Sequence, residues 1–378
     1  MGYLDISSSF DAGAIEVISL ERPDDIRLNI RKDNASDFLQ WFYYRVSGCA
    51  GQQLKMRLMN ASQAAYEKGW PDYQAVASYD RQHWFRVPTS YDGKELVIQH
   101  EPQANVVYYA YFEPYSHERH LDLLASAASN GWVRQEPLGA TIDGRDLDLL
   151  VIGNEAPNQP KVWVIARQHP GESMAEWFIE GMLQRLLDHA DPVARRLLSQ
   201  ATFYVVPNMN PDGSVRGNLR TNAAGANLNR EWLEPSMERS PEVLLVRRKM
   251  EEVGVDLFLD IHGDESIPYV FLAGTEGVPS YSGQIAVLQG TFKAQFLMAS
   301  PDFQTEHGYD KDAPGEANLT MATNFVGERF RCLAFTLEMP FKDNFDLVDK
   351  TTGWNGERSK KLGAAVLQPI WAVVPNLR

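Results

Sequence analysis

Short runs of apolar and aromatic residues, separated by turn-forming residues, fill the chain from about residue 14 to residue 112. Residues 54–58 alternate strictly between apolar and basic side chains, which is typical of a strand with one buried face. Asp92-Gly93 favours a hairpin between two of these runs. Further runs rich in β-branched and aromatic residues are 38–46, 83–87, 96–98 and 106–112. The pattern predicts an all-β sandwich of roughly seven or more strands, with residues 1–114 as its domain.

Aromatic residues are concentrated in two of these runs. They are Trp41, Phe42, Tyr43, Tyr44, Tyr108 and Tyr109. Such side chains supply core and inter-domain packing more often than they form a ligand platform, so we expect them to be buried. The segment before residue 113 contains no set of residues that suggests catalysis.

A different pattern starts after residue 113, where short apolar runs alternate with longer segments of helical spacing. Ser116 can cap a first helix that ends near Asn130-Gly131, and Asp143-Gly144 favours a hairpin. Strands are then predicted at 147–152, 162–166, 203–206, 257–261 and 333–337, and helices at 174–189, 241–253, 285–298 and from about 357. This alternation predicts an α/β domain over residues 115–378, with a mixed, largely parallel sheet and helices on both faces.

The totals limit the partners and the compartment. The formal net charge of -14 disfavours nucleic acid or an anionic membrane as a partner, and no segment approaches the roughly 20 apolar residues of a membrane span. The N-terminus lacks the basic and apolar regions of a secretory signal. Two cysteines, Cys49 and Cys332, are too few for a disulfide framework. We therefore expect a cytoplasmic protein that binds neither nucleic acid nor membrane; its oligomeric state is left open.

The strand predicted at 162–166 runs into the sequence His169-Pro-Gly-Glu172. A histidine nitrogen and a carboxylate oxygen are good zinc donors, and a tight turn between them lets both reach one ion. In open α/β sheets, ligands bind outside the carboxyl ends of the strands, where this turn lies. A catalytic zinc needs a third protein ligand, and His262 directly follows the apolar strand 257–261. These two histidines and the glutamate are therefore predicted to bind one zinc ion.

A carboxylate and several arginines are placed to complete such a site. Glu338 follows the last predicted apolar strand; beside a metal it is suited to act as a general base, and an ion pair with an arginine at the sheet edge is the alternative. The segment 208–232 is rich in Asn and Gly and is predicted to be a long ordered loop. Its Arg216, Arg220 and Arg230 can bind a substrate carboxylate or stabilise an oxyanion, or they can order the loop through ion pairs.

Five short motifs follow one another along the chain: His169-Pro-Gly-Glu172, Asn-Pro-Asp-Gly at 210–213, Asn229-Arg230, His262 and Thr336-Leu-Glu338. Each motif alone is weakly specific, but together they resemble a zinc metallocarboxypeptidase of the carboxypeptidase A clan. The sequences Asn-Leu-Asn-Arg-Glu-Trp, His-Gly-Asp-Glu and Leu-Glu-Met-Pro-Phe-Lys-Asp, behind a β-rich domain, resemble most the bacterial branch of the cytosolic carboxypeptidases. The resemblance is strong from about residue 138 to residue 344.

The resemblance implies a role for each matching residue and gives the same three zinc ligands. Glu338 would be the general base that activates water and later protonates the leaving amine, and Arg220 would polarise the scissile carbonyl and hold the oxyanion. Asn229 and Arg230 would grip the terminal carboxylate of a peptide or protein tail. Cytosolic carboxypeptidases are associated with glutamate-type C-termini, so the resemblance also implies a preference for acidic ends.

Some positions depart from the pancreatic-type pattern. Asn227 stands where those enzymes carry an aspartate beside the first zinc histidine; its amide oxygen can still accept from the imidazole but should raise the basicity of the ligand less. Tyr309 is the candidate for the substrate-capping tyrosine of the family. Lys311 and Arg329 are candidates for the side-chain pocket. Alternation along the strand before the proposed base places Arg331 on the opposite face, so it is expected to be structural.

Two other functions share parts of this pattern. A zinc amidohydrolase of small N-acyl amino acids would have the same zinc ligands, but the pair Asn229-Arg230 and the loop with Arg220 favour a peptidase. A non-catalytic protein that binds peptide tails would not need a general base. Ligands, base and clamp together favour an enzyme, and zinc-dependent removal of C-terminal residues is the predicted function.

Overall fold

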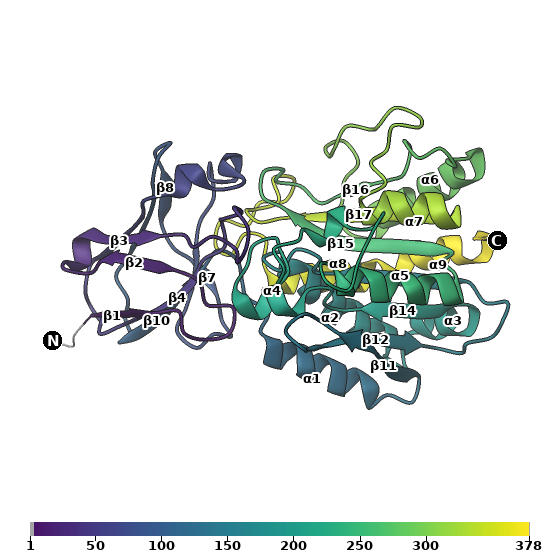
Figure 1. Cartoon of the computed structure of the whole chain (residues 1–378), viewed down its shortest axis with the longest axis horizontal. Helices are drawn as coiled ribbons and strands as arrows, with labels where there is room; N and C mark the ends of the chain where they lie inside the picture. Colours follow the sequence, from purple (N-terminus) through teal and green to yellow (C-terminus); the bar gives the residue numbers. More distant parts are fainter. Residues whose placement is uncertain (1–3, 378) are drawn as a thin grey trace.

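In the computed structural model, which describes residues 4–377, an all-β domain stands beside an α/β domain (Figure 1). The all-β domain has two five-stranded sheets, with the strand orders β1-β4-β10-β6-β7 and β2-β3-β5-β9-β8. Its strands are β1 (Asp5–Ser7), β2 (Glu16–Ser19), β3 (Ile26–Asn29), β4 (Tyr43–Ser47), β5 (Leu54–Leu58), β6 (Val76–Ser78), β7 (Phe85–Arg86), β8 (Thr89–Tyr91), β9 (Leu96–His100) and β10 (Val106–Ala110). The predicted all-β domain is confirmed, although the strand expected at 38–46 starts only at Tyr43.

The core of this domain lies between its two sheets. Alternation along β5 buries Leu54 and Met56, while Lys55 between them is partly exposed. From the opposite sheet, the hydroxyl of Tyr44 reaches the sulfur of Met56 at 3.2 Å, and the ring of Tyr44 lies 5.5 Å from that of Tyr109. Five of the six aromatic residues named above are buried and the sixth is half-buried, which confirms their packing role.

The α/β domain is built on one seven-stranded sheet, with the order β11-β12-β14-β13-β15-β17-β16. Its strands are β11 (Val133–Ala140), β12 (Asp146–Ile152), β13 (Lys161–Ala166), β14 (Thr202–Val206), β15 (Leu257–Asp264), β16 (Phe271–Ala273) and β17 (Leu333–Pro340). The four middle strands β14, β13, β15 and β17 are parallel, and the other pairings are antiparallel. The sheet is therefore mixed, with its parallel part at the centre.

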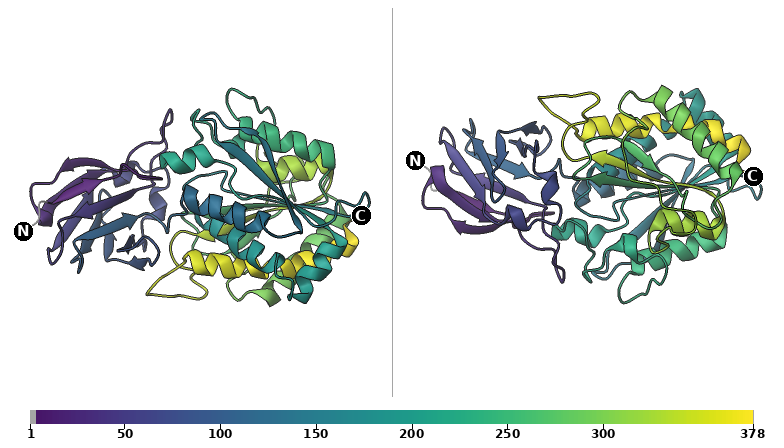
Figure 2. Two further views of the ribbon diagram at one scale, coloured as in Figure 1. Left: turned by 90° about the horizontal axis from the view of Figure 1, so that it is seen from below. Right: turned by 90° about the horizontal axis from the view of Figure 1, so that it is seen from above.

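Helices cover both faces of this sheet (Figure 2). Val162 and Val164 of β13 belong to the apolar cluster that includes Phe178 of α2, whereas Trp163 and Ile165 belong to the cluster that includes α5 and α7. Because successive side chains of a strand point to opposite faces, burial of both faces requires an unbroken apolar run. The helices are α1 (His117–Ala128), α2 (Met174–Leu186), α3 (Pro192–Gln200), α4 (Pro211–Arg216), α5 (Pro241–Val253), α6 (Gly283–Ala299), α7 (Ala322–Phe330), α8 (Gly356–Ala365) and α9 (Leu367–Val373).

Several elements differ from the predicted ones. The segment 208–232, predicted as a loop, contains α4 and a short 3-10 helix, Leu228–Arg230. The helix expected at the C-terminus is two helices, α8 and α9, because Pro369 has no N–H to donate to the carbonyl of Ala365. α2 ends at Leu186, three residues earlier than predicted, and the pattern did not indicate α3, α7 or β16.

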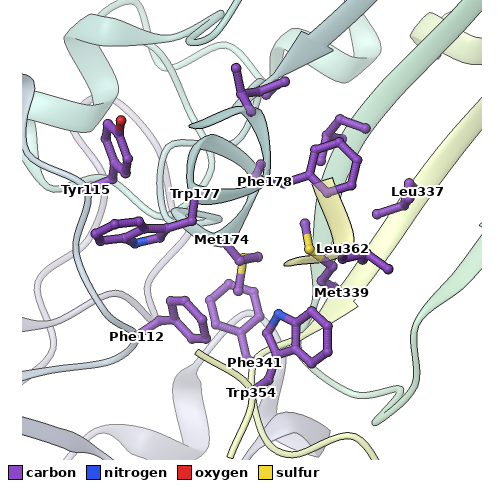
Figure 3. Close-up of a cluster of buried hydrophobic side chains, with 14 of the residues drawn as sticks. Phe112, Tyr115, Met174, Trp177, Phe178, Leu337, Met339, Phe341, Trp354 and Leu362 are labelled. Carbon is purple, nitrogen blue, oxygen red and sulfur yellow. The ribbon is translucent and has the colours of Figure 1, made fainter. Parts of the chain in front are cut away.

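The two domains share an apolar cluster. Phe341, just after β17, stacks on Tyr111 with ring centroids 4.8 Å apart and meets Phe112 edge-on at 5.8 Å. Figure 3 shows Phe112 and Phe341 together, with Trp177 of α2 on one side and Trp354 on the other. Direct packing of this kind fixes the domains against each other, so a cavity at their junction has defined walls.

The chain passes from β10 to α1 through residues 111–116. The predicted domain boundary after residue 114 falls in this connection and stays a prediction. Within residues 4–377, no helix is long and apolar enough to cross a membrane, including the 17-residue α6.

Candidate active site

Three neighbouring parallel strands bring polar residues to one edge of the sheet. β13 ends three residues before His169, while β15 and β17 carry His262 and Glu338, which face each other in the strand register. These side chains line a cavity of about 550 Å³, to which the all-β domain contributes Tyr66 and the segment 303–312 contributes another wall. The carboxyl edge of the parallel strands is thus the floor of the cavity, as predicted.

The turn after β13 is held by buried contacts. Arg167 has a φ of 61°, a left-handed conformation that is uncommon outside glycine. Its guanidinium donates to the carbonyl of Pro170 at 3.1 and 2.8 Å and pairs with Glu176 of α2 at 2.7 Å. The N–H of Gly171 donates to the carbonyl of Leu219 at 2.8 Å, and a Cβ here would lie 2.9 Å from that oxygen. Only glycine therefore allows the turn to approach the following loop so closely.

The predicted metal ligands converge. Nδ1 of His169 lies 2.6 Å from Oε1 of Glu172, and Nδ1 of His262 lies 2.8 Å from Oε2 of the same carboxylate. The two Nδ1 atoms are 3.2 Å apart, and the three side chains are buried with ligand atoms within 4.8 Å of one another. Two imidazole nitrogens and a carboxylate oxygen are a donor set that zinc prefers, so these residues fit the ion.

The outward nitrogen of each histidine faces an acceptor. Nε2 of His169 lies 3.0 Å from Oδ1 of Asn227, within a hydrogen bond, whereas Nε2 of His262 lies 2.9 Å from Oδ2 of Asp260, at ion-pair distance but without hydrogen-bond geometry. A proton on each Nε2 leaves each Nδ1 free for a metal. The expected contact of Asn227 is thus present. Asp260, which Gln168 holds at 2.7 Å, was missed, although its position two residues before His262 on one strand places both side chains on the same face.

The charges of the ligands suit a cation. Burial and the neighbouring Arg220 lower the pKa of His169 to about 3, so this imidazole is neutral. Burial alone would raise the pKa of Glu172, but the two imidazoles outweigh it and hold that pKa below its ordinary value. Burial disfavours the charged form of His262, yet Asp260 and Glu172 outweigh it and raise its pKa well above the ordinary value. A metal ion competes with that proton for the same nitrogen.

Glu338 lies deep in the cavity, with about 6% of its surface exposed. The hydroxyl of Tyr309 lies 3.1 Å from Oε1 of Glu338 and 2.7 Å from Oδ2 of Asp264. Oε2 of Glu338 is buried and makes no hydrogen bond within the described residues. Burial raises the pKa of the Glu338 carboxyl well above its ordinary value. A carboxylate with one unpartnered oxygen is suited to accept a proton inside the cavity.

Two arginines of the loop face the same cavity. Arg220 has Nη1 4.0 Å from Oε1 of Glu172, and its guanidinium makes no hydrogen bond to any described residue. Arg230 donates to the carbonyl of Asn229 at 2.6 Å and forms no ion pair within residues 4–377. The side-chain oxygen of Asn229 accepts from the N–H of Ala322 at 2.8 Å, and its NH₂ group makes no hydrogen bond to any residue that the structure describes. The cavity thus offers several donors to an anion.

Arg216, the third arginine considered, is not part of this set. It pairs with Asp143 at 2.7 Å outside the cavity, so it orders the loop, which was the alternative reading of these arginines. In sum, the structure brings the following predicted residues into one cavity: His169, Glu172, Arg220, Asn229, Arg230, His262, Tyr309, Lys311 and Glu338.

Of the two candidates for a side-chain pocket, one lines the cavity, and its role stays a prediction. Lys311 lines the cavity and pairs with Glu276 at 3.2 Å. The proposal for Arg329 is wrong, because its side chain is 57% exposed and lies near Glu251, away from the cavity. Arg331 ends α7 with a φ of 53° outside the cavity, in agreement with a structural role. No pattern in the sequence indicated Lys293 of α6, which lines the cavity and has no ion pair within the described residues.

Comparisons with known proteins agree with this geometry. A family model described as zinc carboxypeptidase matches residues 117–354, and one described as cytosolic carboxypeptidase N-terminal domain matches residues 6–112. The metallo-carboxypeptidase of Burkholderia cenocepacia has 54% sequence identity and a TM-score of 0.97, with 100% of both chains covered. The metallo-carboxypeptidase of Pseudomonas aeruginosa, solved in complex with (2-guanidinoethylmercapto)succinic acid, has 51% identity and a TM-score of 0.96, over 99% of this chain and 100% of that one.

A more distant similarity links the chain to eukaryotic proteins. Human cytosolic carboxypeptidase 1 is 26% identical over 321 residues, which are 72% of this chain and 26% of the human protein. The chain therefore spans about a quarter of the length of that relative. Because one family model covers more than half of the chain, and because the fold and the buried His-Glu-His group agree with it, the chain belongs to the zinc carboxypeptidases, hydrolases that use one zinc ion, and is homologous to the cytosolic carboxypeptidases.

Proposed function

We propose that this protein removes C-terminal residues from peptides or protein tails, with zinc bound by His169, Glu172 and His262. The observation that carries the proposal is the position of Arg220 and Arg230, whose guanidinium groups face the ligand cavity without a hydrogen bond to a carboxylate of the described residues. Zinc in this site supplies a Lewis acid and lowers the pKa of water.

Glu338 is proposed as the general base. Its unpartnered Oε2 would accept a proton from the attacking water and later deliver it to the nitrogen of the leaving amine. Arg220 would donate to the scissile carbonyl oxygen and stabilise the negative charge that develops there. Its free N–H groups support this role, because a guanidinium already bonded to a protein carboxylate would have fewer donors for the substrate.

The terminal carboxylate would be bound by Arg230 and by the free NH₂ group of Asn229. Such a clamp fixes the distance between the chain end and the reacting bond, so it selects the last peptide bond. Tyr309, whose hydroxyl lies over Glu338, is proposed to cap the bound terminal residue. The succinate group of the ligand in the Pseudomonas aeruginosa complex is consistent with a site for carboxylates.

We further propose a preference for acidic terminal residues. The support is the half-buried Lys293, which lines the cavity without an ion pair among the described residues. Lys311 contributes less, because Glu276 lies 3.2 Å from its ammonium. A cytoplasmic location is proposed as well, supported by similarity to the cytosolic carboxypeptidases and by the unpaired, buried thiols of Cys49 and Cys332.

The test is mass spectrometry of a peptide panel after incubation with the zinc-loaded protein. The panel ends in Glu, Glu-Glu, Ala, Leu or Lys, each with a free or an amidated carboxyl group, and N-acetyl amino acids are included. We expect stepwise loss of residues from free ends only, fastest for Glu. The variant Glu338→Gln should retain zinc and lose at least about 1000-fold in kcat, whereas the exposed control Glu238→Gln should match the wild type.

Other results would replace the proposal. Cleavage of N-acetyl amino acids without cleavage of peptides would identify an amidohydrolase. Loss of Ala, Leu or Lys in preference to Glu would leave the mechanism intact and refute the acidic preference. No turnover of any compound by protein with confirmed zinc would indicate a binding protein.

A further inference from the structure

The backbone that carries Arg220 is held by a buried carboxylate of the other domain. Oδ1 of Asp33 accepts from the N–H of Leu219 at 2.6 Å, and Oδ2 accepts from the N–H groups of Arg220 at 2.8 Å and Thr221 at 2.9 Å. The hydroxyl of Thr221 donates to Oδ2 as well, at 3.0 Å. These three amides make no other hydrogen bond within residues 4–377. Asp33 is therefore the acceptor that fixes the backbone conformation of residues 219–221.

The guanidinium end of Arg220 is enclosed by the same domain. Its Cζ lies 5.3 Å from the ring centroid of Tyr66 and 5.7 Å from that of Phe38. Aromatic rings at such distances attract a cation and restrict where its side chain can lie. Tyr66 also lines the active-site cavity. The all-β domain thus contacts both the backbone and the charged end of one cavity arginine.

Further contacts join the segment that follows Asp33 to the loop on both sides of Arg220. The side chain of Asn34 donates to the carbonyl of Ala223 at 2.7 Å and accepts from Asn218 at 2.6 Å. A Cβ on Gly225 would lie only 2.2 Å from the carbonyl oxygen of Ala35, so the two backbones touch there. Contacts with the all-β domain therefore extend from residue 218 to residue 225 of the loop, and Asp33 binds the backbone within this stretch.

Burial explains why Asp33 fixes the backbone conformation at Arg220. A carboxylate with about 4% of its surface exposed loses most of its hydration, and it is tolerated only where hydrogen bonds replace that water. Four donors converge on its two oxygens, so a displacement of the loop would leave a buried charge partly unsatisfied. The conformation around Arg220 is thus more strongly fixed than that of an ordinary surface loop.

We propose that Asp33 is a positioning residue for catalysis: from the all-β domain, it sets the backbone at Arg220 so that the guanidinium meets the oxygen that becomes negative during peptide-bond cleavage. This inference rests on the role proposed above for Arg220. It gives the all-β domain a part in the reaction, since neither domain alone contains both the zinc ligands and the residue that positions the arginine.

The test combines kinetics with a double-mutant cycle on the best-cleaved peptide of the panel. Asp33→Asn keeps the shape of the side chain but presents an NH₂ group to some of the donors. Because misplacement of a catalytic group by about 1 Å costs on the order of 100-fold in rate, we expect kcat to fall by about that factor, with KM within threefold and zinc content unchanged. Asp37→Asn, in the same segment but fully exposed, is the matched control and should match the wild type.

The cycle separates positioning from a general structural effect. If Asp33 acts through Arg220, the double variant Asp33→Asn/Arg220→Ala loses little more than Arg220→Ala alone; if the two losses multiply, the inference is overturned. A folded Asp33→Asn protein with the kcat of the wild type would also overturn it. If Asp33→Asn fails to fold, the test uses Phe38→Leu, which removes one of the two aromatic rings beside the guanidinium of Arg220. This variant must then lower kcat severalfold, and an unchanged kcat refutes the inference.

Hydrogen exchange gives a readout that does not depend on activity. Exchange of the amides of Leu219, Arg220 and Thr221 should be at least about tenfold faster in Asp33→Asn than in Asp37→Asn, and equal exchange overturns the inference. If the wild type cleaves no peptide, the proposed function fails. Hydrogen exchange still tests whether Asp33 fixes the backbone of residues 219–221. If Arg220→Ala retains the kcat of the wild type, the role of Arg220 fails, and the positioning role fails with it.

Discussion

Glu242 is a buried carboxyl whose ionisation should make the stability of the fold depend on pH. It lies in the first turn of α5 and has no exposed surface. The side chain of Asn222 donates to its two oxygens at 3.4 and 3.1 Å, and the oxygen of the same amide accepts from the N–H groups of Ala224 and Ala226 at 3.0 Å each. Burial raises the pKa of Glu242 from the ordinary 4.5 to about 7.

The sign and size of the effect follow from this shift. Because the folded protein holds the proton more tightly than the unfolded chain, the stabilisation from protonated Glu242 is complete below pH 4.5 and is lost as the pH rises through about 7. About 2.5 pKa units at 1.36 kcal/mol each give about 3 kcal/mol. For a chain of 378 residues that unfolds as one unit, an unfolding entropy of about 2.1 cal/mol/K per residue converts this into about 4 °C in Tm.

The assay is differential scanning calorimetry of wild type and Glu242→Gln at pH 5 and pH 8. Gln keeps an acceptor for Asn222 but has no proton to lose. Because the stabilisation is not yet complete at pH 5, we expect Tm of the variant, relative to wild type, to be about 3 °C higher at pH 8 than at pH 5. The exposed control Glu238→Gln should show no such difference. An equal Tm change of Glu242→Gln at both pH values would refute the reasoning, because Glu242 would then ionise as freely in the fold as in the unfolded chain.

Two further substitutions test the zinc ligands and the proposed specificity. Asp260→Asn should weaken zinc binding by about 10- to 100-fold in a competition titration with a chelator, since a neutral amide would replace the carboxylate beside Nε2 of His262; an unchanged affinity would show that this contact does not tune the ligand. Lys293→Gln should lower kcat/KM for Glu-ended peptides by about tenfold or more and change Ala-ended peptides less than threefold, with the exposed Lys361→Gln as control. Equal losses for both peptides would remove Lys293 from the specificity pocket.

The residues at strand ends could be predicted from the sequence for a physical reason. Apolar strands buried on both faces are easily recognised, and the sheet brings their carboxyl ends together whatever their separation in sequence. His169 follows β13, and His262 and Glu338 lie near the carboxyl ends of β15 and β17, so their meeting required only the fold class. The same reasoning could have predicted Asp260, because residues two apart on a strand point to the same face and Asp260 lies two residues before His262.

Contacts that depend on long-range docking could not be read from the pattern. Arg216 and Arg220 lie four residues apart in one polar segment, and nothing local indicates that the first pairs with Asp143 while the second faces the zinc ligands. Lys293 has the spacing of an ordinary helical residue. Asp33 lies in a different domain, so its partners are defined only when the two domains pack. Tertiary contacts determine where a side chain in a loop or helix points, and the periodicity of the sequence does not predict these contacts.

The proposed preference for acidic ends requires charge selection at short range. With a net charge of -14, the protein repels an acidic tail as it approaches, although salt screens this repulsion beyond roughly 8 Å. Inside the cavity, the guanidinium of Arg220 lies 4.0 Å from Glu172 without a hydrogen bond to any described residue, and Arg230 forms no ion pair within residues 4–377. Partial burial strengthens each hydrogen bond that they make to an anion. On the proposed preference, an acidic substrate would therefore gain its binding energy only inside the cavity. On the roles proposed above, the position of Arg220 would then decide how fast the bound substrate reacts, and the all-β domain that holds its backbone would contribute to that step.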